Sequence, residues 1–190
     1  FLKRMADSIQ NMGKKVMGWD EVASAGLKKE NTRVMWWRHD KPQLLKNAVG
    51  NGYETIMCPR RPLYFDFVQH DSHKDGRRWG GFCPIEDVYA FPNPEMTGGE
   101  YFTSSLVKGI QANVWTETMH TPERLEFMVF PRLSALAEAA WTNDMNKDFD
   151  GFKTRLKGMI SFYEGENIRL FDPLKPDRIN EIKGVPQKKK

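Results

Sequence analysis

Aromatic residues and carboxylates occur together where predicted buried strands end. Trp19 is followed by Asp20 and Glu21, and Trp115 is followed closely by Glu117. A sugar ring has C–H faces that stack on aromatic rings and hydroxyls that donate hydrogen bonds to carboxylates. The combination therefore predicts a carbohydrate-binding pocket.

Two further strand ends carry the same residue types. Trp36 and Trp37 end one strand candidate, and Tyr64 and Asp66 follow another. Because side chains alternate along a strand, only one of the adjacent tryptophans can face the pocket. A purely structural role is the alternative for these tryptophans, since a tryptophan near a strand end is often part of the core. The acid pair after the first strand could likewise be a solvated helix start favoured by the helix dipole.

The spacing of apolar residues predicts the elements that position these groups. Strands are predicted over 16–19, 32–37, 54–58 and 107–115, and helices over 2–12, 42–49, 121–141 and 149–163. The helix predicted over 121–141 would bury an apolar stripe that includes Leu125, Leu133 and Leu136. Between residues 59 and 94 we expect a long functional loop, which its aromatic residues make ordered rather than disordered.

Alternation of strands and helices is typical of parallel α/β structure. Four strands are too few for a complete (β/α)8 TIM barrel of about 250 residues, but they suffice for the second half of one. A small doubly wound sheet is the alternative, although no strand is followed by a glycine-rich phosphate motif. We predict an α/β fold that forms a partial (β/α)8 barrel over residues 1–165, followed by a C-terminal tail over 166–190.

Composition excludes several classes of protein. The 190 residues are 39% hydrophobic and 12% aromatic, which supports a packed core. The net charge is +4, of which Lys188, Lys189 and Lys190 supply three charges, and no basic stripe indicates nucleic-acid binding. No apolar run reaches the roughly 18 residues of a membrane span. The chain starts at Phe1 without a visible signal peptide, as expected of an excised segment.

No metal or other cofactor is expected. The four histidines, His39, His70, His73 and His120, are dispersed and share no metal-ligand spacing. Cys58 and Cys83 lack the CxxC spacing of a metal or redox site, although they could form one disulfide. Arg60-Arg61 and Arg77-Arg78 could bind an anion, but paired basic residues in a loop are usually solvated.

Several motifs together resemble the family 20 glycoside hydrolases, the β-N-acetylhexosaminidases. The motifs are Gly18-Trp19-Asp20-Glu21, Tyr64-Phe65-Asp66, the run from Gln111 to Glu117, and the run from Phe130 to Trp141. The resemblance extends from residue 1 to about residue 156. It implies a (β/α)8 barrel of which this chain supplies about strands 5 to 8 with their helices. It also implies hydrolysis of terminal β-linked N-acetylglucosamine or N-acetylgalactosamine with retention, the substrate's own acetamido oxygen being the nucleophile.

The resemblance implies roles for seven residues. The catalytic residue is Tyr64, whose phenol would donate to the acetamide oxygen and align it. The substrate-binding residues are Asp66 and Glu117 for sugar hydroxyls, Trp115 beneath the sugar ring, and Trp19, Trp37 and Trp79 around the acetamido group.

One departure from the family pattern concerns the acid. The family's Asp-Glu pair after strand four supplies the general acid and orients the acetamide nitrogen, and this sequence has no counterpart of it. Asp20-Glu21 does not match that pair, because it follows the strand-five tryptophan. We therefore expect the parent protein to be an enzyme and this segment alone to be inactive.

The expected partners follow from the same resemblance. They are a glycan or N-acetylhexosaminide substrate, in a periplasmic, secreted or otherwise extracytoplasmic setting, and the remaining N-terminal half of the barrel. Without the N-terminal half, the unpaired edge strands of this segment would favour a homo-oligomer. Two rival functions stay open: a non-catalytic sugar-binding module or pseudoenzyme, and a different barrel hydrolase whose acid is Asp20, Glu21 or Glu117.

Overall fold

The chain folds into two compact units in a computed structural model that describes residues 1–178 and 180–185. The sheet unit comprises Phe1–Arg60 and Pro92–Gln111, and the helical unit comprises Arg61–Phe91 and the chain from Ala112 onward. The three C-terminal lysines lie outside the described residues. In the described part of the predicted tail, 166–178 and 180–185, there is no helix or strand.

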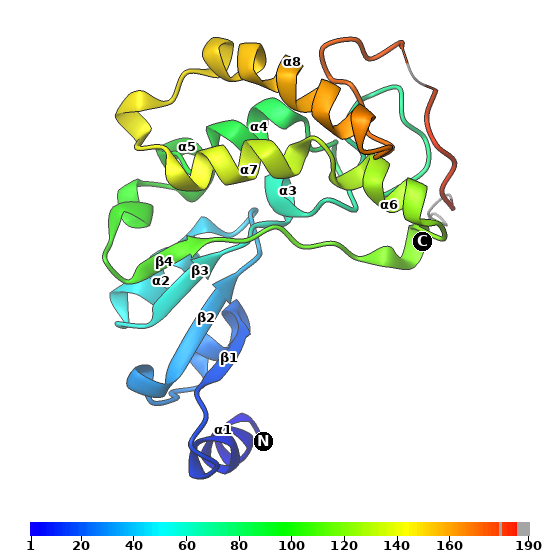
Figure 1. Ribbon diagram of the computed structural model, residues 1–190. Coiled ribbons are helices and arrows are strands. Elements are labelled where there is room, and N and C mark those ends of the chain that lie inside the picture. Colours follow the sequence, from blue (N-terminus) through cyan, green and yellow to red (C-terminus); the bar gives the residue numbers. More distant parts are fainter. Residues whose placement is uncertain (179, 186–190) are drawn as a thin grey trace. The chain divides into compact units, whose positions relative to one another are not determined.

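A four-stranded parallel sheet forms the sheet unit (Figure 1). Its strands are β1 (Val16–Trp19), β2 (Thr32–Trp36), β3 (Glu54–Met57) and β4 (Val107–Ile110). In the register, Trp19 lies opposite Met35, and Trp36 lies opposite Met57. The strands stand side by side in chain order, β1-β2-β3-β4. The predicted α/β class is therefore confirmed, and the order matches successive barrel strands, because a doubly wound sheet reverses its order at a switch point.

Strand β4 is shorter than predicted. The prediction extended it to residue 115, but it ends at Ile110, because β3, with which it pairs among the described residues, ends at Met57. A bulge at Lys108 precedes Gly109, whose φ of +155° is one that residues with a Cβ rarely adopt. Beyond Gln111 the chain continues into the helical unit, where Asn113 forms an isolated parallel bridge with Tyr64.

The helices predicted over 2–12 and 42–49 are confirmed in the sheet unit, which also contains a short helix that was not predicted. The helices of the sheet unit are α1 (Leu2–Asn11), α2 (Pro42–Gly50) and α5 (Pro94–Thr97). Val34 of β2 packs with Ala48 of α2 and with Tyr53, all of them buried. Four of the five residues of β2 are buried, as expected of a strand between two parallel neighbours.

The predicted loop over 59–94 contains two helices and so was wrong in part. The helical unit holds α3 (Arg60–Leu63, whose first residue belongs to the sheet unit), α4 (Ile85–Ala90), α6 (Pro122–Val129), α7 (Arg132–Trp141) and α8 (Phe149–Gly165). In α4 the buried residues Ile85, Val88 and Tyr89 have helical spacing, and two acids stand in its first turn. That pattern was readable in the sequence.

The single helix predicted over 121–141 was also wrong. Pro131 separates α6 from α7, because proline has no N–H to donate and its ring clashes with the preceding turn. The break resets the helical phase, so Leu125 and Leu133 of the predicted stripe are exposed while Ala135 and Leu136 are buried. The predicted start is confirmed: the Thr121 side chain accepts a hydrogen bond from the Arg124 N–H.

Helices α4, α7 and α8 pack together through polar and aromatic contacts (Figure 1). The Tyr89 ring stacks on Phe152 at 4.7 Å between centroids, and its hydroxyl donates to Glu138 at 3.1 Å. Ser134 and Tyr163 share a 2.7 Å hydrogen bond between α7 and α8. Among the residues that the structure describes, no helix is both long and apolar enough to cross a membrane.

A buried histidine gives the helical unit a pH-dependent stability. The His73 ring lies 5.1 Å from that of Phe127 and 4.6 Å from that of Phe171. Burial, reinforced by the Arg124 charge and more weakly by His70, Arg132 and Arg78, lowers the pKa of His73 to about 4. The unfolded chain binds this proton below about pH 6.5 and the folded chain only below about 4, so stability falls as the pH drops through that window.

Replacing this histidine is expected to remove the penalty. In the wild type, His73 should lower the free energy of unfolding by up to about 3 kcal/mol as the pH falls from 7 to 4. In a His73→Phe variant this decrease should be absent from urea unfolding curves. Asp66 titrates oppositely over part of that range but is present in both proteins, so the difference between them isolates His73. The exposed His120, replaced by Gln, is the control. Equal pH dependence of wild type and His73→Phe would refute the assignment.

Candidate functional site

The ends of β1 and β2 are joined by a buried carboxylate. Asp20 begins a 3₁₀ turn after Trp19, and its side chain has no exposed surface. It accepts hydrogen bonds from the Trp37 and Arg38 backbone N–H groups at 3.3 Å and from the Arg38 guanidinium. Hydrogen bonding to Asp20 raises the pKa of Arg38. Asp20 therefore holds the chain after β2 and is not a solvated helix start.

The predicted tryptophans of this unit lie beside that carboxylate. Trp37 donates its ring N–H to Glu21 at 3.3 Å and carries the Arg38 and Arg60 guanidinium groups 5.8 and 5.5 Å from its ring centre. Its neighbour Trp36 is completely buried and donates to a backbone carbonyl, so the two rings differ in environment, as alternation along a strand requires.

In the helical unit, two distant segments pair like short strands. The Phe65 N–H donates to the Asn113 carbonyl at 2.8 Å, and the Asn113 N–H donates to Leu63 at 2.9 Å. Tyr64 and Asn113 form a parallel bridge. This pairing puts Tyr64 beside Trp115, with ring centroids 6.1 Å apart and planes tilted by 43°.

An arginine links the two predicted sugar-binding carboxylates. Arg77 Nε lies 2.6 Å from Asp66 Oδ2, and Arg77 Nη2 donates to Glu117 Oε1 at 2.9 Å. The same guanidinium lies 4.6 Å from the centre of the Trp79 ring, whose edge-on neighbour is Phe67. The side chain of Asp66 has no exposed surface, whereas that of Glu117 is 62% exposed. The sequence prediction that Arg77 is solvated was wrong, since its side chain is only 15% exposed.

Burial strongly affects the titration of the Asp66 carboxyl. Desolvation raises the pKa of Asp66 to about 6, against the opposing pull of Arg77. The carboxyl is therefore ionised at neutral pH and able to accept a hydroxyl hydrogen bond, and it becomes protonated in mild acid.

A buried arginine behind the cluster was missed by the sequence analysis. Arg132 is fully buried and donates to the carbonyls of Phe65 at 2.7 Å, Cys83 at 3.0 Å and Met128 at 3.2 Å. Burial lowers its pKa to about 10, so it stays charged. It thereby holds the segment that carries Tyr64 and Asp66. The position within the Phe130–Trp141 motif was visible in the sequence, but the role was not.

The structure therefore gathers five of the seven predicted residues in the helical unit, namely Tyr64, Asp66, Trp79, Trp115 and Glu117. The other two, Trp19 and Trp37, belong to the sheet unit. In the helical unit, Asp66, Glu117 and Trp79 lie against Arg77, and Tyr64 lies beside Trp115. In the sheet unit, Trp37 lies beside the Asp20–Arg38 pair.

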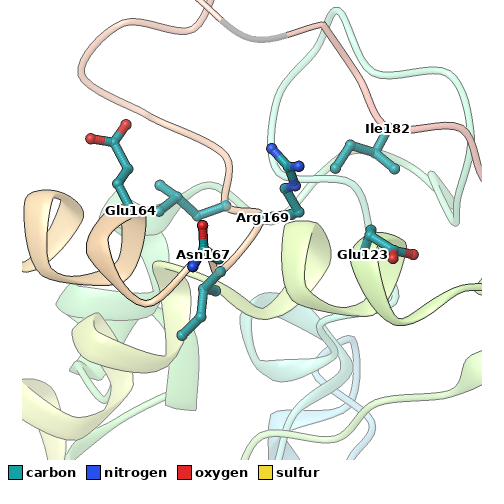
Figure 2. A pocket seen from close by; sticks show the side chains of 7 residues that line it. Glu123, Glu164, Asn167, Arg169 and Ile182 are labelled. Atoms are coloured by element: carbon teal, nitrogen blue, oxygen red, sulfur yellow. The ribbon is translucent and has the colours of Figure 1, made fainter.

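A separate pocket of about 500 Å³ lies in the helical unit (Figure 2). It is lined by Glu123, Glu164, Asn167, Ile168, Arg169, Leu170 and Ile182, and by none of the predicted site residues. Among the described residues no cluster of histidine, cysteine and acidic side chains could hold a metal ion. Cys58 and Cys83 are both buried and not disulfide-bonded.

Comparisons with known proteins agree on one family. Residues 1–144 match the sequence model of the catalytic domain of glycosyl hydrolase family 20. A β-hexosaminidase of Porphyromonas gingivalis is 37% identical over 92% of the chain, and a β-N-acetylhexosaminidase of Cellulomonas fimi is 30% identical over 86%. The chain spans 22% and 33% of the lengths of these two relatives.

A solved structure shows the same partial coverage. The exo-β-N-acetylglucosaminidase of Vibrio harveyi in complex with N-acetylglucosamine superposes with a TM-score of 0.78 at 26% identity, over 91% of this chain and 27% of that one. Together with the parallel sheet in chain order, this likeness confirms the predicted fold, a partial (β/α)8 barrel.

Proposed function

The chain belongs to glycosyl hydrolase family 20, and from this premise we propose that the protein containing it removes terminal β-linked N-acetylglucosamine or N-acetylgalactosamine from a glycan. The observation that carries the proposal is the cluster of Tyr64, Trp115, Asp66 and Glu117, held by backbone pairing and by Arg77. Rings and carboxylates of this kind suit the faces and hydroxyls of one sugar.

In this proposal Tyr64 is the catalytic residue. Its hydroxyl donates to the oxygen of the substrate's 2-acetamido group and aligns that oxygen with the anomeric carbon. The oxygen attacks, the bond to the leaving oxygen breaks, and an oxazolinium ion forms, which water then opens with overall retention. Alignment of a neutral nucleophile lowers the barrier by fixing its geometry before reaction.

The remaining predicted residues bind the substrate. Asp66 and Glu117 accept hydrogen bonds from sugar hydroxyls, and Trp115 stacks beneath the ring. The resemblance to the family assigns binding of the acetamido group to Trp79 and to Trp19 and Trp37 of the sheet unit. Arg77 keeps both carboxylates in place. Because the Asp66 side chain has no exposed surface, Arg77 must move or share this carboxylate when a sugar hydroxyl donates to it.

The proton for the leaving group comes, in this proposal, from a residue outside these 190. Asp20 is paired with Arg38, and Glu117 is paired with Arg77, so we do not assign proton donation to the leaving group to either of them. The N-terminal half of the barrel is the proposed source and also the proposed partner of the edge strands β1 and β4.

The test is hydrolysis by the protein encoded by the complete reading frame that contains this chain. We expect release of chromophore from an aryl β-N-acetylglucosaminide, with the β-anomer of the free sugar appearing first in proton NMR spectra. The corresponding aryl β-glucoside lacks the acetamido group and is the control substrate, which should react at least about 10²-fold more slowly. Binding of N-acetylglucosamine without hydrolysis would favour a sugar-binding module instead, and first appearance of the α-anomer would exclude the proposed mechanism.

A further inference from the structure

The described C-terminal residues pack against the loop at Lys74 and Asp75 and against α6. We call residues 180–185 the C-terminal strap; they lie outside the 1–144 range matched by the family model. Glu181 accepts hydrogen bonds from the backbone N–H groups of Lys74 at 2.7 Å and Asp75 at 3.1 Å. Ile182 packs against the cluster that includes Phe127 and Phe171, and Figure 2 shows it beside the first turn of α6. The strap is thus fixed by both polar and apolar contacts.

A buried charge pair secures the same contact. Arg124, whose side chain is 1% exposed, lies 3.1 Å from Glu181. Arg124 also donates to the carbonyls of Asp75 and Ile182. A buried guanidinium needs such partners, because an uncompensated charge in the interior is strongly unfavourable. Loss of the Glu181 charge would therefore loosen the strap and the loop together.

Gly184 allows the strap to approach closely at a second point. Its N–H donates to Asp75 Oδ2 at 3.0 Å, and the next N–H, of Val185, donates to the Thr118 carbonyl at 3.1 Å. A Cβ at Gly184 would come within 2.8 Å of the Thr118 carbonyl oxygen and within 3.0 Å of Arg124 Nε. No larger residue fits there without displacement of the backbone.

Both contacts lie next to the ends of the arginine bridge. Asp75 is two residues from Arg77, whose N–H donates to the Asp66 carbonyl at 3.1 Å. Gly76 between them is packed so tightly that a Cβ would lie 2.9 Å from Val68. On the other side, Thr118 follows Glu117 directly in one 3₁₀ turn. One strap therefore anchors both chain segments that the Asp66–Arg77–Glu117 bridge connects.

We propose that the C-terminal strap is a positioning element of the sugar-binding site, with Glu181 and Gly184 holding Arg77 and Glu117 in place for the substrate's hydroxyls. The inference rests on the proposed function, and it assigns a role to a segment that the sequence analysis treated as a tail. Glu181 acts through the loop and through Arg124, without contact to the sugar.

The experiment compares Glu181→Gln and Gly184→Ala with wild type in the protein from the complete reading frame. The matched control is Glu138→Gln, which weakens a carboxylate–arginine pair with Arg155 in the same unit but away from the strap. We expect KM for an aryl β-N-acetylglucosaminide to rise about tenfold in both strap variants while kcat changes less, because displaced carboxylates weaken sugar binding. The control should keep its KM.

Hydrogen exchange separates this inference from the proposed function. Amides 74–77 and 116–118 should lose protection in the strap variants and keep it in the control. Unchanged KM together with unchanged protection in the strap variants would overturn the inference. If wild type neither binds nor hydrolyses the substrate, the proposed function fails, and exchange at these amides alone decides whether the strap positions the loop. Should Glu181→Gln not fold, Gly184→Ala carries the same test.

Discussion

The 190 residues by themselves are expected to release no measurable chromophore from an aryl β-N-acetylglucosaminide, whereas the protein from the complete reading frame should turn it over. A glycosidic oxygen leaves only when it is protonated, and loss of the general acid lowers the rate by about 10² or more. Asp20 has no exposed surface and is engaged by Arg38, so it cannot replace that acid. Absence of the other barrel strands also removes part of the pocket, which lowers the rate further.

The control for this comparison is the folded state of the shorter chain. Sedimentation should show self-association, because β1 and β4 are parallel edge strands without outer partners among the described residues. Circular dichroism must show helix and strand for the inactivity to be informative. Turnover by the 190 residues alone would contradict the assignment of the acid, and isosteric amide substitutions at Asp20, Glu21 and Glu117 would then identify it.

Replacing Tyr64 by Phe in the complete protein is expected to lower kcat by about 10²- to 10³-fold, the usual cost of removing one donor aimed at a developing charge. The ring remains, so its contact with Trp115 at 6.1 Å and the backbone bridge to Asn113 should persist. KM should therefore change little. Rates measured with an aryl β-N-acetylglucosaminide at saturating concentration check the prediction.

Tyr53→Phe is the matched control, because it too deletes one tyrosine hydroxyl. That hydroxyl donates to the Leu27 carbonyl at 2.9 Å inside the sheet unit, so its loss should reduce stability by about 1 kcal/mol and leave kcat unaltered. If Tyr64→Phe retained more than about a third of the wild-type kcat, the phenol would not be the group that aligns the acetamide.

Local sequence patterns predicted most elements because short-range physics decides them. The run from Val16 to Trp19 is a strand as predicted, and Pro42 begins a helix where the prediction placed it. One error arose where a partner strand, and not the local sequence, sets the limit of an element. Strand β4 ends at Ile110, and the N–H of the next residue, Gln111, donates to the carbonyl of Met57, where β3 itself ends. No pattern within 107–115 contains that information.

The helix break at Pro131 is a different kind of error. Its cause is local, since proline removes a hydrogen-bond donor and excludes the preceding helical turn. The apolar spacing on either side was read as continuous, although the proline already predicts two helices with separate buried faces. The break between the two helices is therefore predictable from the sequence alone.

By itself the sequence determined the class of the fold, the family, and which residue types could contact a sugar, because these depend on periodicity and on motifs of neighbouring residues. Only the tertiary structure decided that Arg77 joins Asp66 to Glu117, that Arg132 holds the Tyr64 segment, and that Glu181 reaches back to Lys74. These contacts join residues that are distant along the chain. Only the folded backbone brings such residues together, so neither apolar periodicity nor a motif of neighbouring residues contains that information.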